Sequence, residues 1–108
     1  MKYRIEITSS ANADIESAYC YIRDDSPENA ITWREGFYVV ADTLSRFPEG
    51  CGLALENDYV DFEVRQTFYG SYRILFTIEG NRVIILKVRH GARRSMRPDE
   101  LTEPDDIT

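Results

Sequence analysis

Apolar and polar residues alternate along residues 2–8, which is the pattern of a β-strand with one buried face. Tyr3, Ile5 and Ile7 share one face, and charged or polar side chains occupy the other. Residues 9–12 then offer candidate N-caps for a helix. Apolar residues spaced three and four apart predict that this helix is amphipathic and runs to about Asp24; they are Ile15, Ala18, Tyr19 and Ile22.

A second helix is predicted from Ser26 to about Arg46. Ser26 is a typical N-cap, and Pro27 suits the first helical position because the amide hydrogen that proline lacks would have no partner there. The run 47–50 contains proline and glycine, so it ends the helix. The buried stripe of this helix consists of Ala30, Trp33, Phe37, Val40, Ala41 and Leu44. Because the link between the two helices is short, they form a helical hairpin.

The remaining chain predicts three strands joined by tight turns. Residues 51–61 show no period and are interpreted as a loop. After them, apolar residues alternate with polar ones or are rich in β-branched side chains over residues 62–69, 72–79 and 82–90. Links of two residues that begin with glycine, at Gly70 and Gly80, are typical of β-hairpins.

This order of elements predicts an α+β fold, β-α-α-β-β-β, in which an antiparallel sheet packs against the helical hairpin. We expect residues 1–97 to form a single domain, because 108 residues with 43% hydrophobic content suffice for one core. Residues 98–108 are predicted to be an acidic, flexible tail.

Composition excludes several classes of protein. No apolar run approaches the roughly 18 to 20 residues that span a bilayer, so no membrane partner is expected. The N-terminal residues lack the apolar stretch of a secretion signal, and we therefore expect the protein to be cytoplasmic. Cys20 and Cys51 match no metal or redox spacing and are expected to be free thiols, with a disulfide as the alternative. Neither a metal nor a cofactor is predicted.

The charge is distributed unevenly. Residues 1–61 carry 12 acidic and 5 basic side chains, whereas residues 62–97 carry 8 basic and 2 acidic ones. The formal net charge of -6 argues against nonspecific binding to nucleic acid, because such binding requires cations that neutralise phosphates. The basic block at 62–97 still permits docking to an anionic partner, and the alternative is a solvated sheet face.

Several basic residues of this block are predicted to meet at one end of the sheet. Pairing outward from the turn at Gly80 places Arg73 roughly opposite residues 87–89. Arg65 can join from the neighbouring strand if its side chain faces the same way. The predicted group consists of Arg65, Arg73, Arg89, His90, Arg93 and Arg94.

Arginine forks suit phosphate or carboxylate, and a histidine is able to act as a general acid or base near neutral pH. The group could therefore cleave RNA, by helping a ribose 2′-hydroxyl attack the adjacent phosphate, or contact acidic residues of a partner protein. A structural role at the strand end, hydrogen-bonded to backbone, is the other interpretation of His90.

Over about residues 3–94 the chain resembles the RelE/ParE superfamily of bacterial toxins, and it resembles the ParE-like branch more than the RelE-like branch. The resemblance lies in the element order and in three runs: Tyr72-Arg73-Ile74-Leu75-Phe76, Glu79-Gly80-Asn81 and Ile85-Leu86-Lys87-Val88-Arg89-His90-Gly91-Ala92-Arg93-Arg94. It implies the toxin of a type II toxin–antitoxin module, with roles in growth inhibition and plasmid stabilisation and with a cognate antitoxin as partner.

RelE-like members cut ribosome-bound mRNA with arginines, a lysine and a C-terminal tyrosine or histidine, whereas ParE-like members are known for blocking DNA gyrase. By position, Arg73 and Arg93 match the two family arginines, but no tyrosine follows Tyr72 and the lysine position is Ala92. The leading hypothesis is therefore a toxin that binds a bacterial protein such as gyrase.

Two alternatives stay open. One is a ribosome-dependent mRNA endonuclease with Arg73, Arg93 and His90 as catalytic residues. The other is an inactive family member that acts as a binding module. In the leading hypothesis, the target- or antitoxin-binding residues are Arg65, Arg73, Arg89, Arg93 and Arg94.

Overall fold

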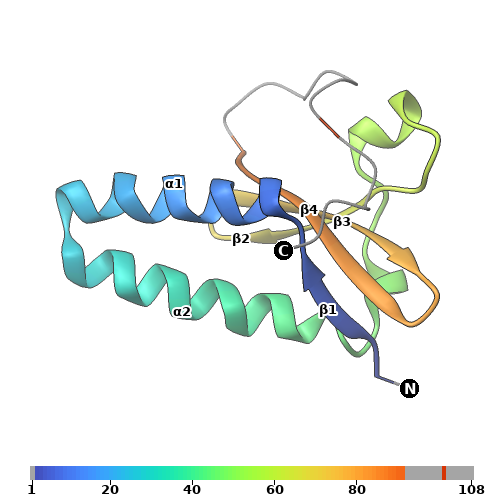
Figure 1. Ribbon diagram of the computed structural model, residues 1–108, viewed down its shortest axis with the longest axis horizontal. Helices are drawn as coiled ribbons and strands as arrows, with labels where there is room; N and C mark the ends of the chain where they lie inside the picture. The colour runs from blue at the N-terminus through green and yellow to red at the C-terminus, as the bar shows by residue number, and fades with distance from the viewer. Residues whose placement is uncertain (1, 92–100, 102–108) are drawn as a thin grey trace.

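The computed structural model describes residues 2–91 and Leu101. Its elements are β1 (Arg4–Ile7), α1 (Ser9–Asp25), α2 (Pro27–Thr43), the 3-10 helices η1 (Pro48–Gly50) and η2 (Leu55–Tyr59), β2 (Arg65–Tyr69), β3 (Tyr72–Glu79) and β4 (Arg82–His90). The predicted order β-α-α-β-β-β is confirmed, and the two helices lie side by side as a hairpin (Figure 1). None of the described helices is long and apolar enough to cross a membrane.

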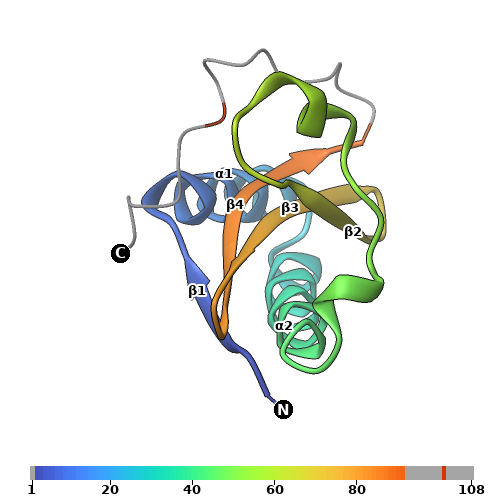
Figure 2. The ribbon, with the colours of Figure 1, turned by 90° about the vertical axis from the view of Figure 1, so that its right-hand side faces the viewer.

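The four strands form one sheet in the order β1-β4-β3-β2 (Figure 2). Strands β2, β3 and β4 are the predicted antiparallel meander. β1 pairs with β4 in the parallel direction, so the complete sheet is mixed. A parallel neighbour requires a long connection between the two strands, and here the helical hairpin and the first two strands of the meander provide it.

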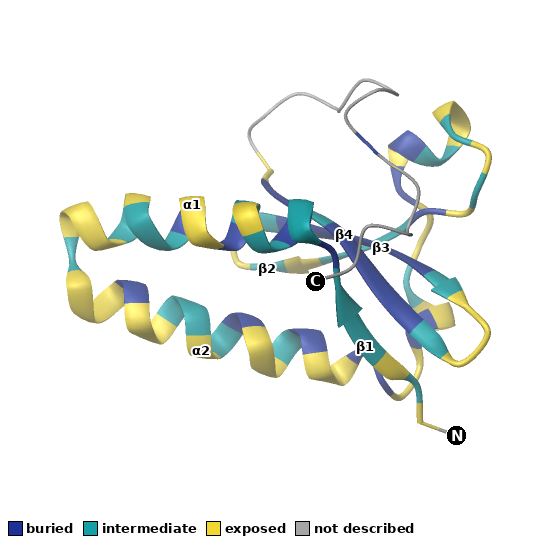
Figure 3. Ribbon diagram, in the orientation of Figure 1, coloured by how far each residue is buried: buried dark blue, intermediate teal, exposed yellow. Residues whose placement is uncertain are grey.

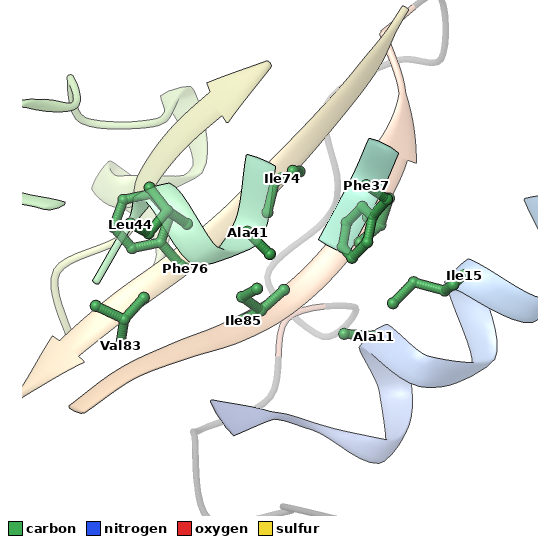
Figure 4. Close-up of a cluster of buried hydrophobic side chains, with 10 residues drawn as sticks. Ala11, Ile15, Phe37, Ala41, Leu44, Ile74, Phe76, Val83 and Ile85 are labelled. Carbon is green, nitrogen blue, oxygen red and sulfur yellow. The ribbon is translucent and has the colours of Figure 1, made fainter. Parts of the chain in front are cut away.

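The main hydrophobic core lies between the helical hairpin and one face of the sheet. Ala11 and Ile15 of α1 and Phe37 of α2 point toward the strands, as Figure 4 shows. The strands contribute Ile74, Phe76, Val83, Ile85 and Val88. This core explains the predicted helical stripes, because residues three and four apart on each helix face the same sheet.

The opposite face of the sheet carries a second, smaller core, and β3 and β4 are therefore buried on both sides (Figure 3). Its members are Ala54, Val64, Leu75, Ile84, Leu86 and Leu101. The predicted loop contributes Ala54, whose amide donates to the carbonyl of Val64 over 2.9 Å. Of the predicted tail at 98–108, the structure describes Leu101, which is buried here; the remainder lies outside the described residues.

The predictions for the helix caps and the turns were partly correct. Ser26 caps α2 and Pro27 is its first residue, as predicted, and both turn glycines have positive φ, at 57° for Gly70 and 60° for Gly80. The N-cap of α1 is Thr8, so the prediction of a cap among residues 9–12 was wrong. The helix starts earlier because Thr8, still extended at the end of β1, already accepts a hydrogen bond from the amide of Ala11.

Two further boundaries differ from those predicted. α2 ends at Thr43 rather than near residue 46, and β2 begins at Arg65 rather than at residue 62. Both cysteines are free, as expected.

Candidate functional site at the arginine end of the sheet

Arg73 of β3 and Arg89 of β4 are direct cross-strand partners, which agrees with the predicted register. They lie on the face of the second core, because Arg73 is two residues from Leu75 and alternate residues of a strand share a face. Both side chains are almost removed from water, with 7% of Arg73 and 9% of Arg89 exposed. The two predicted site residues are thus brought together, but beneath the surface.

A β-bulge decides this pairing. The register between β3 and β4 shifts between Leu75 and Phe76, so that Leu86 is an extra residue in β4. Without the shift, counting from the turn would place Arg73 opposite Val88, and Arg89 would point toward the helices. The extra residue moves Arg89 to the face that Arg73 occupies.

The guanidinium of Arg73 makes four hydrogen bonds to side chains of its own chain. Its Nη1 and Nη2 donate to the two carboxylate oxygens of Glu56 over 3.1 and 2.7 Å. Its Nε and Nη2 donate to Oε1 of Gln66 over 3.1 and 2.9 Å. Glu56 is 1% exposed, so this is a buried ion pair with two-point geometry.

Neither Glu56 nor Gln66 was predicted from the sequence as a partner of Arg73. Glu56 belongs to η2, inside the segment that was interpreted as a loop, and no period distinguishes its carboxylate from those of Asp58 and Asp61 nearby. Gln66 follows the strand alternation, but the pattern does not reveal that its amide oxygen faces an arginine. A buried ion pair between residues 17 positions apart has no local signal.

Arg65 lies on the other face of the sheet and does not join Arg73. Its register partner is Phe76, a residue of the main core. Its Nη1 donates to the carbonyl oxygens of Cys51 and Glu49 over 2.6 and 3.2 Å, and its Nε donates to Glu63 over 3.1 Å. Arg65 therefore braces the segment that follows α2.

Two further cations of the basic block, Arg82 and Lys87, also bind carboxylates of the same chain. Arg82 pairs with Glu6 at 2.7 Å and with Glu79 at 2.9 Å. Lys87 pairs with Asp14 of α1 at 3.2 Å. Much of the positive charge counted in the sequence is thus balanced internally. Arg93 and Arg94 lie outside the described residues, so their predicted position near Arg73 stays a prediction.

His90 lies at the same end of the sheet but on the helix side. It pairs in register with Tyr72, and the two rings meet edge to face with their centroids 5.2 Å apart. Because neighbouring residues of a strand point to opposite faces, the imidazole is directed away from Arg73 and Arg89. In the described part of the chain, no three histidine, cysteine or acidic side chains form a group able to hold a metal ion.

Comparisons with known proteins agree with this architecture. A search of curated proteins finds no significant match. The chain is similar in fold to a solved structure of the chromosomal ParDE toxin–antitoxin system from P. aeruginosa, with 20% identity, a TM-score of 0.67, and coverage of 82% of this chain and 96% of that one. It is also similar to a structure of the toxin–antitoxin complex RelBE2 from Mycobacterium tuberculosis, with 24% identity, a TM-score of 0.58, and coverage of 86% and 95%.

The sequence itself matches a family model over residues 5–95, from the first strand to just beyond the last. This region contains the helical hairpin, the meander and the paired arginines described above. The match spans most of the chain, so the chain belongs to the family of ParE toxins of type II toxin–antitoxin systems.

Proposed function

We propose that this chain acts as the toxin by binding a bacterial target protein, with DNA gyrase as the first candidate, and that a cognate antitoxin neutralises it. Membership of the ParE toxin family supports a toxin role. The two similar structures come from a toxin–antitoxin system and a toxin–antitoxin complex, which supports an antitoxin partner. We expect both partners to be met in the bacterial cytoplasm.

The observation that favours binding over catalysis is the state of Arg73. Catalysis of RNA cleavage by the ribose 2′-hydroxyl uses a cation that stabilises the phosphate and a proton-transfer group within reach of the same phosphate. Here the guanidinium of Arg73 is engaged by Glu56 and Gln66, and His90 lies on the opposite face. This arrangement supports a toxin that acts through its surface.

A supercoiling assay tests the gyrase proposal. Purified protein at micromolar concentration is expected to inhibit gyrase, and co-purified antitoxin to relieve the inhibition. We propose Arg93 and Arg94 as target contacts, so Arg93→Ala and Arg94→Ala should weaken inhibition. Arg46→Ala, at an exposed arginine that follows the C-terminus of α2, is the matched control. If the protein neither inhibited gyrase nor co-precipitated with it, gyrase would be excluded as the target.

The same variants distinguish the alternatives. If the chain were a ribosome-dependent endonuclease, translated transcripts would be cut, and Arg73→Ala, Arg93→Ala and His90→Ala would each abolish cleavage. Primer extension on transcripts from induced cells measures this, and we expect them to stay intact. If the chain were an inactive binding module, induction without antitoxin would leave growth unchanged, whereas we expect arrest.

A further inference from the structure

A groove lies along one side of α1, on the opposite side of the sheet from the arginine pair. One stripe of α1 contains Asp14, Ser17 and Tyr21, spaced three and four residues apart so that they share a face. This stripe borders the ends of β3 and β4. The resulting cleft has a volume of about 480 Å³, and its walls include Asp14, Ser17, Tyr21, Tyr72, Val88 and His90.

Tyr21 is the central side chain of this groove. It is 77% exposed, and it lines both the cleft and a second hollow beside Asp24 and Asp25, so it lies between the cleft and these two carboxylates. Tyr21 and Tyr72 line the same cleft. Burial raises the pKa of Tyr72, and the Tyr21 phenol adds to that increase. The groove therefore offers aromatic walls to a side chain that enters it.

The far end of the groove carries uncompensated negative charge. Asp24 and Asp25 continue the stripe of α1 and are exposed, and neither makes an ion pair with another described residue. The neighbouring cation, Arg23, lies over the ring of Tyr19 at 5.9 Å. At the near end, Lys87 balances Asp14. This part of the hairpin extends beyond the sheet, so the strands do not cover it (Figure 1).

An aromatic cleft beside unpaired carboxylates favours a cationic peptide and repels a polyanion. We propose that this groove binds a segment of a partner protein in which an aromatic or large aliphatic side chain is flanked by lysine or arginine. The apolar side chain enters between Tyr21 and Tyr72, and the flanking cations reach Asp24 and Asp25. This assigns a protein-binding surface to the α1 side of the molecule, separate from the arginine end.

Short fluorescent peptides test the chemistry of this groove on the full-length protein. The probe has a lysine–tryptophan–lysine centre, and its matched controls replace both lysines by glutamate or the tryptophan by alanine. Fluorescence anisotropy should show the probe binding about tenfold more tightly than either control. Added salt should lower the affinity for the probe, because the aspartates are exposed and salt screens their charge.

Variants locate the binding. Tyr21→Ala should lower the affinity for the probe about fivefold, and so should the double change Asp24→Asn with Asp25→Asn. These side chains are exposed, so the variants should fold, which thermal melts verify. Tyr59→Ala and Asp42→Asn, exposed residues elsewhere, should stay within about twofold of the parent protein. Three results would each overturn the proposal. They are equal affinity for all three peptides, an unchanged probe affinity in Tyr21→Ala, and tighter binding of a single-stranded RNA 12-mer than of the probe.

Discussion

The Glu56 carboxylate and the Arg73 guanidinium lie almost entirely out of water, with side-chain exposures of 2% and 9%. Removing two charges from water is costly, and the cost is offset here because the pair makes two hydrogen bonds and Gln66 accepts from two further N–H groups of the guanidinium. The pair also ties η2 to the sheet, together with the Asn57 side chain, which accepts from the amide of Val64 over 2.8 Å. Glu56 and Asn57, two residues of a segment without periodicity, thus hold η2 against the sheet beside the second core.

Glu56→Gln should destabilise the fold strongly, because it leaves the charge of Arg73 buried and uncompensated. We expect the free energy of unfolding to fall by about 3 kcal/mol, measured by urea denaturation. Asp58→Asn, exposed in the same 3-10 helix, should change it by less than about 0.5 kcal/mol. Replacing both partners, with Glu56→Leu and Arg73→Met, should recover most of the loss. A Glu56→Gln protein as stable as its parent would contradict the role of the pair.

A second residue pair sets a pKa. The Tyr3 hydroxyl donates to the carboxylate of Glu49, and this hydrogen bond lowers the pKa of Glu49 and raises that of Tyr3. Because the folded-state pKa of Glu49 is lowered, its contribution to stability is present above the unfolded-state pKa and is lost as pH falls through the folded-state value. Tyr3→Phe should raise the pKa of Glu49 toward its ordinary value, as measured by NMR titration of the carboxyl carbon. Tyr59→Phe should leave it unchanged, and no shift in Tyr3→Phe would exclude this coupling.

At the scale of elements, Thr8 joins a strand to a helix. Its amide donates to the carbonyl of Ile85 over 3.1 Å, which extends the pairing of β1 with β4. Its hydroxyl accepts from the amide of Ala11 over 3.1 Å and lies within hydrogen-bond distance of the carbonyls of Ile85 and Leu86. One buried side chain therefore fixes the angle at which α1 leaves the sheet, and with it the position of the helical hairpin.

Thr8→Ala should lower the free energy of unfolding by about 1 to 2 kcal/mol, because an N-cap and a buried hydrogen bond are lost together. Thr8→Ser keeps the hydroxyl and should cost clearly less. Guanidinium denaturation of both variants measures the difference. If serine were as harmful as alanine, the methyl group rather than the hydroxyl would be responsible.

On the scale of the whole molecule, β3 and β4 are shared by two cores. Helices cover one face of these strands, and the segment from Ala54 to Val64, with Leu101, covers the other. The helical hairpin has the opposite character at its tip, where it extends past the sheet and is largely exposed (Figure 3). Stability is therefore concentrated in the central strands, while the tip is available for binding.

Amide hydrogen exchange should follow this division. The slowest amides should belong to Ile74–Phe76 and Ile84–Ile85, which open only with global unfolding, whereas residues 22–30 at the hairpin tip should exchange far sooner. NMR exchange experiments on the full chain resolve both groups. Equal protection at the tip and in the central strands would contradict the assignment of stability.

Some features followed from the sequence alone because they depend on neighbouring residues. Hydrophobic periodicity over a few positions predicted both helices and all four strands, and the glycine turns predicted the meander. The tight turn at Gly80 brought Arg73 near Arg89, because a two-residue hairpin limits the register of its strands. The superfamily could be recognised from residues 72–94 because the residues that carry the resemblance lie in one contiguous stretch of sequence.

Tertiary packing alone determined which side chains interact at the site. The parallel pairing of β1, the bulge at Leu86, the position of Arg65 on the helix side and the choice of Glu56 as partner of Arg73 each depend on contacts between distant segments. A carboxylate carries no mark of which cation it will meet, because that is settled by burial and by the geometry of the surrounding chain. Local periodicity therefore specified the elements, and the packing of the two cores determined which charges they withdrew from the surface.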